Sequence, residues 1–231
     1  MAKNRFDTFG VMLDMSRNSV MKLSTLKEYM LYMKKMGYNA LFLYVEDTYE
    51  VDGEPFFGYM RGKYTKEEMK ALDQYGASIG IEVIPCIQTL AHIKEFLRWG
   101  KAPIDKDDVL LVGEERTYEL IEHMLATLSE CFKTRRIHIG MDEAHSLGRG
   151  AYLDKYGHEN TAVIIGKHLA RVQEIAEKYG YTPMIWSDMF FRPWNNHGYY
   201  IEKCEMPKEY VEALPEGVIP VYCANLWICL P

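Results

Sequence analysis

Apolar and polar positions follow one another along the chain in a repeating unit of apolar run, polar loop, amphipathic segment and glycine. The apolar runs are short and bounded by polar residues, which predicts β-strands. Segments with apolar residues every three or four positions lie between them and predict helices, with Ser24 and Thr65 as N-caps and glycines as stops. The predicted strands are Phe9–Asp14, Ala40–Val45, Glu82–Gln88, Arg136–Met141, Met184–Asp188 and Val218–Cys223. The predicted helices are Ser24–Met36, Thr65–Ile79, Glu114–Phe132 and Ala162–Tyr179.

Alternation of apolar strands with amphipathic helices predicts an α/β fold with a parallel sheet covered by helices. Each predicted strand ends in polar or aromatic residues, and no glycine-rich GxGxxG segment follows the first strand. Both features favour a (β/α)8 TIM-type barrel over a dinucleotide-binding open sheet. About six of the eight βα units are present. Since a barrel without two strands has open edges, we expect residues 1–231 to form a single catalytic barrel domain that is incomplete at its C-terminal end.

Composition narrows the class of protein. The 231 residues are 48% hydrophobic and 26% charged, with a net charge of −6, which is typical of a globular protein and gives no basic surface for nucleic acid. No apolar run approaches the roughly 20 residues of a membrane helix. The five cysteines form no CxxC pair and the N-terminus lacks a signal-peptide core. We therefore expect a cytoplasmic location, with a trimmed secretion signal as the alternative.

The stretch Arg136–Glu143 carries the most informative chemistry. Its alternating pattern predicts a strand that delivers Asp142 and Glu143 side by side at its C-terminal end. Two uncompensated charges at the end of a buried strand are costly, and this end of a barrel strand is where active sites are built. The alternative is a solvated strand–loop junction with two surface acids.

His138-Ile139-Gly140-Met141-Asp142-Glu143 resembles the H-x-G-x-D-E signature of family 20 glycoside hydrolases, the β-N-acetylhexosaminidases. Gly10–Asp14 is similar to that family's first barrel strand, and Tyr44–Asp47 and His92 stand where its members place sugar-contacting residues. The chain departs from the family in having Phe9 where many members have an arginine, in lacking the histidine-rich second-strand segment, and in lacking the last two strands. The resemblance implies an exo-acting enzyme that releases terminal N-acetylglucosamine or N-acetylgalactosamine.

The resemblance also implies roles for the acid pair. Adjacent strand residues point to opposite faces, so Asp142 and Glu143 are poorly placed as an acid and a nucleophile on one bond. In substrate-assisted hydrolysis the 2-acetamido oxygen attacks C1, and the protein supplies no nucleophile. Glu143 is then the general acid and base, and Asp142 orients the acetamido group and stabilises the positive intermediate.

Further candidates lie at other strand ends. The resemblance implies that Trp186 walls the acetamido pocket; the alternative is a packed core indole. Tyr222 and Trp227 would add walls or simply pack. His92 would bond a sugar hydroxyl or orient Asp142, unless it is a satisfied loop histidine.

Several charged residues follow the first, second and fifth strands. Asp14 and Arg17 are candidates for substrate binding, although a charge pair that fixes the barrel rim is the stronger alternative. Glu46 and Asp47 would bind sugar hydroxyls or form an exposed acidic loop. Asp188 would orient the neighbouring tryptophan or bind substrate.

No cofactor is expected. His138, Asp142, Glu143 and His145 invite a metal interpretation, but no HExxH or CxxC spacing supports zinc. The expected partner is an N-acetylhexosamine-containing glycan, and an open barrel edge favours association between copies.

Two rival functions remain open. One is a barrel glycosidase with a conventional nucleophile, for which Glu46 and Asp188 are the candidates. The other is a carbohydrate-binding or inactive barrel fragment that binds sugar without turnover.

Overall fold

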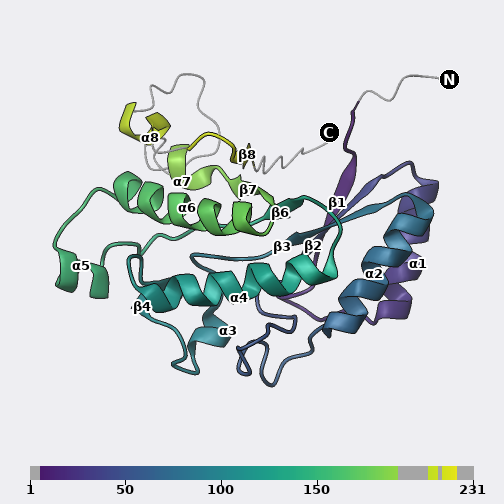
Figure 1. Cartoon of the computed structure of the whole chain (residues 1–231), viewed down its shortest axis with the longest axis horizontal. Coiled ribbons are helices and arrows are strands. Elements are labelled where there is room, and N and C mark those ends of the chain that lie inside the picture. The colour runs from purple at the N-terminus through teal and green to yellow at the C-terminus, as the bar shows by residue number, and fades with distance from the viewer. Residues whose placement is uncertain (1–5, 192–207, 213–214, 223–231) are drawn as a thin grey trace, which may run out of the picture.

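The computed structural model of the chain describes residues 6–191, 208–212 and 215–222 (Figure 1). Six strands form one parallel sheet in the order β1-β2-β3-β6-β7-β8. Their bounds are β1 Gly10–Asp14, β2 Ala40–Tyr44, β3 Glu82–Cys86, β6 Arg136–His138, β7 Thr182–Trp186 and β8 Ile219–Val221. The spatial order follows the sequence with no reversal, as in the wall of a barrel, whereas an open doubly wound sheet reverses at a switch point. The predicted fold, six strands of a (β/α)8 TIM-type barrel, is confirmed.

Four long helices connect the strands and pack against one another in sequence order. They are α1 Leu23–Lys35, α2 Lys66–Ile79, α4 Glu115–Cys131 and α6 Thr161–Lys178. Shorter elements complete the described chain: α3 Lys94–Leu97, α5 Ala151–Tyr156, α7 Asp188–Phe191, α8 Lys208–Glu212 and a hairpin of β4 Ile104–Lys106 with β5 Val109–Leu110. The hairpin and the short helices were not predicted.

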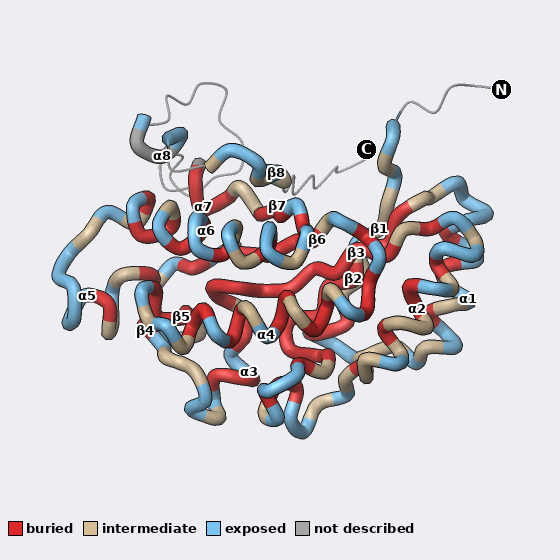
Figure 2. The backbone as a smooth tube through the Cα atoms, in the orientation of Figure 1, coloured by how far each residue is buried: buried red, intermediate tan, exposed pale blue. Residues whose placement is uncertain are grey.

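Burial differs between the centre and the edges of the sheet. Figure 2 shows β2, β3 and β6 mostly buried, while β1 and β8 carry many intermediate or exposed residues. Side chains that face the helices, such as Leu41, Val83 and Ile137, are at most 1% exposed. The alternate residues face the barrel interior. There, register places Cys86 of β3 beside His138 of β6.

The caps of two predicted helices had different outcomes. Thr65 caps α2 as predicted: its side chain accepts the Glu68 backbone N–H, and the Glu68 side chain accepts the Thr65 N–H. Gly80 ends this helix in the left-handed conformation. The prediction that Ser24 is an N-cap is wrong, because α1 already begins at Leu23 and Lys22 holds the cap position.

One hydrophobic cluster joins the sheet and the helices, and the single-domain expectation stays a prediction. Cys86 and Cys131 are buried free thiols; the other three cysteines lie outside the described residues, so the reducing compartment also stays a prediction. No helix in the described part of the chain is long and apolar enough to cross a bilayer.

The capping box of α2 gives a stability prediction. Replacing Thr65 with Ala leaves the Glu68 N–H without its side-chain acceptor and should lower the free energy of unfolding by about 1 kcal/mol. Urea denaturation measures the change, with Thr65→Ser expected to retain most of the stability. Ser78→Ala removes an exposed hydroxyl from the other end of α2 and should change stability by less than about 0.5 kcal/mol. Equal losses from T65A and S78A would contradict the assignment.

Candidate active site

The loop after β6 brings the acid pair to the C-terminal end of the sheet. Strand β6 ends at His138, because Gly140 and Met141 both have φ of 72° and Glu143 has φ of 52°. A Cβ on Gly140 would lie 2.0 Å from Gln88 Oε1, so this turn requires glycine. The chain therefore leaves the strand before it reaches Asp142 and Glu143. The expectation that pleating sends their side chains to opposite faces is wrong.

His92 brings the two acids together. Its Nε2 lies 3.3 Å from Asp142 Oδ2 and 3.7 Å from Glu143 Oε2. The His92 backbone has φ of 60°, and its N–H donates to Asp108 Oδ2 at 3.2 Å. Of the alternatives considered for His92, the contact with Asp142 is the one that is present in the structure.

The protonation of this group follows from its contacts. The interaction with the Asp142 carboxylate raises the pKa of His92 to about 9, although burial opposes the charged form. Burial likewise opposes ionisation of Asp142, but the His92 and Gln88 contacts outweigh it and lower the pKa of Asp142 below its ordinary value. At neutral pH the pair is an imidazolium and a carboxylate.

Gln88 is a site residue that the sequence analysis did not single out. It is completely buried. Its Nε2 donates to Asp142 Oδ1 at 2.8 Å and to the Tyr44 hydroxyl at 3.1 Å, and its Oε1 accepts the Met141 N–H at 3.2 Å. The sequence contained one signal for Gln88: it is the polar residue at which the apolar run around β3 ends, at the same end of the sheet as the acids.

Glu46 and Asp47 are buried, at 8% and 1% exposure, so the alternative of an exposed acidic loop is wrong. Glu46 accepts hydrogen bonds from Tyr44 and Ser16. Asp47 pairs with Arg61. Burial raises the pKa of Asp47 to about 6, and the Arg61 charge only partly opposes this. Both acids are therefore held by contacts inside the protein, and only Glu46 lines a cavity.

Asp14 and Arg17 form an ion pair at the rim of β1. Arg17 Nε lies 2.5 Å from Asp14 Oδ2, and Asp14 Oδ1 also accepts the backbone N–H groups of Ser16 and Arg17. The Arg17 guanidinium lies 5.2 Å from the centre of the Tyr44 ring. The pair has the geometry expected for fixing the barrel rim.

Trp186 ends β7 beside the acid loop. Its backbone N–H donates to the Gly140 carbonyl at 3.1 Å, and its ring lies 4.5 Å from that of His138 at an angle of 51°. The indole is half-buried. His138 is buried, its Nδ1 accepts the Gly140 N–H at 3.1 Å, and burial lowers its pKa to about 4. A neutral imidazole therefore supports both Trp186 and the turn.

Asp188 lies at the start of α7 and is 3% exposed. Its Oδ2 accepts the Glu143 backbone N–H at 3.2 Å. Asp188 therefore contacts the backbone of Glu143.

The candidates near the C-terminus are placed less fully. Tyr222, one residue beyond β8, is 50% exposed. Trp227 lies outside the described residues.

A cavity of about 470 Å³ adjoins this group of residues. It shares His92 and Glu46 with the network around the acids. Its lining is polar and consists of Ser16, Arg17, Asn18, Glu46, Arg61, His92, Lys94, Glu95 and Asp108. The acid pair thus stands beside a hollow formed by the loops that follow β1, β2 and β3.

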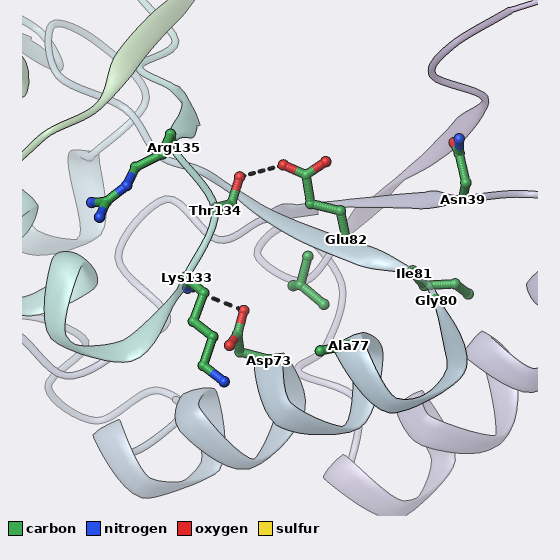
Figure 3. A pocket seen from close by; sticks show the side chains of 10 residues that line it. Asn39, Asp73, Ala77, Gly80, Ile81, Glu82, Lys133, Thr134 and Arg135 are labelled. Carbon is green, nitrogen blue, oxygen red and sulfur yellow. Dashed lines mark hydrogen bonds between the residues drawn. The ribbon is translucent and has the colours of Figure 1, made fainter.

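A second hollow of about 560 Å³ lies at the opposite end of the strands. Figure 3 shows it between the end of α2, the start of β3 and the segment before β6, where Thr134 bonds Glu82 and Asp73 accepts the Lys133 N–H. Because barrel active sites are built at the C-terminal ends of the strands, this hollow has no part in the candidate site.

Among the described residues, no group of three or more His, Cys, Asp or Glu side chains is arranged to hold a metal ion. The expectation that the protein needs no metal stays a prediction.

Comparison with known proteins supplies the family. The profile described as glycosyl hydrolase family 20, catalytic domain, matches residues 6–203. Hexosaminidase D from Homo sapiens is 25% identical over 183 residues, covering 73% of this chain and 37% of that protein. The chain therefore spans well under half the length of this relative.

Two solved structures agree in fold. The exo β-N-acetylglucosaminidase of Vibrio harveyi, solved with N-acetylglucosamine, has a TM-score of 0.75 at 17% identity, over 94% of this chain and 38% of that one. The β-N-acetylhexosaminidase of Streptomyces coelicolor A3(2) has a TM-score of 0.66 at 26% identity, over 80% and 40% of the two chains.

The contact between His92 and Asp142 makes a prediction in solution. The His92 Hε1 signal should titrate near pH 9 in the wild type and near its ordinary 6.5 in Asp142→Asn. Because the folded pKa of His92 is raised, its stabilising contribution is complete below pH 6.5 and is lost as pH rises through about 9. Two-dimensional NMR follows the signal, and Asp154→Asn at an exposed position of α5 should leave the midpoint unchanged. A wild-type midpoint near 6.5 would contradict the geometry.

Proposed function

Because the chain belongs to glycosyl hydrolase family 20, we propose that it hydrolyses terminal β-linked N-acetylglucosamine or N-acetylgalactosamine from glycans with retention of configuration. The observation that carries this proposal is the convergence of Asp142 and Glu143 on His92, with Asp142 held ionised. Two carboxyl groups with different contacts suit two different tasks. The expectation of a cytoplasmic catalytic domain belongs to the same proposal.

The proposed reaction uses the substrate's own acetamido group. The acetamido oxygen attacks C1 while the bond from C1 to the glycosidic oxygen breaks. Glu143 gives its proton to this glycosidic oxygen, which leaves with the departing sugar. Glu143 then takes a proton from water, whose oxygen attacks C1 and reopens the cyclic oxazolinium to the N-acetyl sugar. The protein ends the cycle with Glu143 protonated again.

Asp142 is suited to the second task. It is ionised and fixed by Gln88 and His92, so it can accept the acetamido N–H and stabilise the positive charge of the intermediate. His92 lies closer to Asp142 than to Glu143. Its positive charge is therefore offset mainly by Asp142.

The remaining candidates have proposed supporting roles. Trp186, with Tyr222 and Trp227, would wall the sugar. Glu46 and Arg17 line the cavity beside His92 and would contact sugar hydroxyls.

The deeper acids near the site have contacts that suit supporting roles. Asp188 would hold the Glu143 main chain, since it accepts that N–H. Asp14 and Asp47, each paired with an arginine, would fix the ends of β1 and β2 at the barrel rim.

The conventional-nucleophile rival finds less support. Glu46 is engaged by Ser16 and Tyr44, and Asp188 is 3% exposed. Glu46 lines the cavity, but both of its carboxylate oxygens already accept hydrogen bonds, and Asp188 accepts the Glu143 backbone N–H.

Changing Glu143 to Gln should lower kcat by about 100-fold or more, because general acid catalysis contributes on that scale. The assay compares 4-nitrophenyl N-acetyl-β-glucosaminide with chitobiose, whose poorer leaving group needs the proton more and should lose more rate. Glu119→Gln, the same change at an exposed position of α4, is the control.

Equal rates for wild type and E143Q would rule out Glu143 as the acid. Binding of N-acetylglucosamine in calorimetry with no turnover by the wild type would favour the carbohydrate-binding alternative.

Changing Asp142 to Asn should lower kcat by about 100-fold, because a preorganised charge aimed at the transition state is removed. The wild type should hydrolyse the acetamido sugar but not 4-nitrophenyl β-glucoside, which lacks the internal nucleophile. Little change in kcat for D142N, or covalent labelling by a 2-fluoro sugar, would instead favour a protein nucleophile.

A further inference from the structure

Gln88 uses every polar atom of its side chain within the candidate site. One amide hydrogen goes to Asp142 and the other to Tyr44, while the carbonyl oxygen accepts the Met141 N–H. The orientation of the amide is thereby fixed, because Asp142 requires a donor and the Met141 N–H requires an acceptor.

The neighbouring groups fix the direction of the same chain of hydrogen bonds. The Tyr44 hydroxyl donates to Glu46 Oε1 at 2.9 Å, which leaves its oxygen to accept from Gln88. Two buried or half-buried carboxylates, Glu46 and Asp142, are thus joined through two neutral groups that donate toward them. A titratable acid in place of Gln88 would bring a third like charge between them.

The turn that carries the acids is fitted to this amide. Gly140 leaves room for Gln88 Oε1, which would lie 2.0 Å from a Cβ at that position. Met141 follows with a left-handed backbone and gives its N–H to the same oxygen. Gln88 therefore contacts both the main chain of the turn and the carboxylate beyond it.

We propose that Gln88 is a positioning residue that holds the Asp142 carboxylate and the Gly140–Met141 turn in one arrangement and links them through Tyr44 to Glu46. This inference rests on the proposed function for its effect on catalysis. Its effect on the titration of His92 beside Asp142 does not depend on the proposed function and is measured separately.

The test uses the full chain with Gln88→Met, which keeps the length of the side chain but makes none of the three hydrogen bonds. Thr89→Val is the matched control: Thr89 is the next residue, is equally buried, and donates to the Ile139 carbonyl of the same loop. Circular dichroism and urea denaturation establish that both variants are folded.

In Q88M the His92 Hε1 midpoint should fall from about 9 toward 6.5, since Asp142 loses its second anchor. The rate constant kcat for 4-nitrophenyl N-acetyl-β-glucosaminide should fall about 10- to 100-fold, the scale of one hydrogen bond to a charged group, with KM changed less than about threefold. T89V should keep the wild-type midpoint and kcat.

Gln88→Glu gives an independent result should Q88M not fold. The added carboxylate disfavours ionisation of Asp142, so the acid limb of the kcat profile should move to higher pH, a shift that simple loss of packing does not produce. A folded Q88M or Q88E with the wild-type midpoint and pH profile would overturn the proposal. If the His92 midpoint shifts in Q88M but the wild type hydrolyses no substrate, the proposed function is overturned and the positioning role of Gln88 stands.

Discussion

The site depends on the cost of burying the Asp142 carboxylate. An ionised carboxyl group that is 22% exposed at the end of a sheet needs donors and a countercharge. Gln88 supplies a donor and His92 supplies the charge, and both lie in the segment that follows β3. The two strands β3 and β6 are paired neighbours, so the sheet itself brings the acid to its partners.

The hairpin of β4 and β5 ties together the two loops that carry these groups. Asp105 accepts the backbone N–H groups of Gly148, Gly150 and Tyr152, beyond the acid pair. Asp108, in the turn of the same hairpin, accepts the N–H of His92. One short element therefore restrains both the histidine and the acid loop, and the left-handed backbone at His92 is held by a specific contact.

The sheet also shows where further structure would meet this part of the barrel. Strands β1 and β8 form its two edges, and Met12, on the inner face of β1, is 37% exposed. Since a barrel buries its inner residues only when it is closed, the two edges are the places where additional βα units would pair. The loops that follow β3 and β6 already carry His92 and both acids.

The sequence by itself determined the fold class, the strand order and the end of the sheet where the acids lie. Apolar runs of strand length are read from local pattern, and parallel connection through helices leaves few arrangements. Thr65 was equally predictable, because both halves of its capping box lie within four residues.

The tertiary structure decided how the site is assembled. His92 and Gln88 are about fifty residues from Asp142, and no local pattern encodes a contact across that distance. The left-handed turn at Gly140 and Met141, which takes the acids out of the strand, depends on Gln88, because Gln88 Oε1 occupies the space that a side chain at Gly140 would need. The burial of Glu46 and Asp47 likewise depends on Tyr44, Ser16 and Arg61 meeting them from other segments. Side-chain periodicity is a local property, whereas the pairing of buried charges is settled only when distant strands come together.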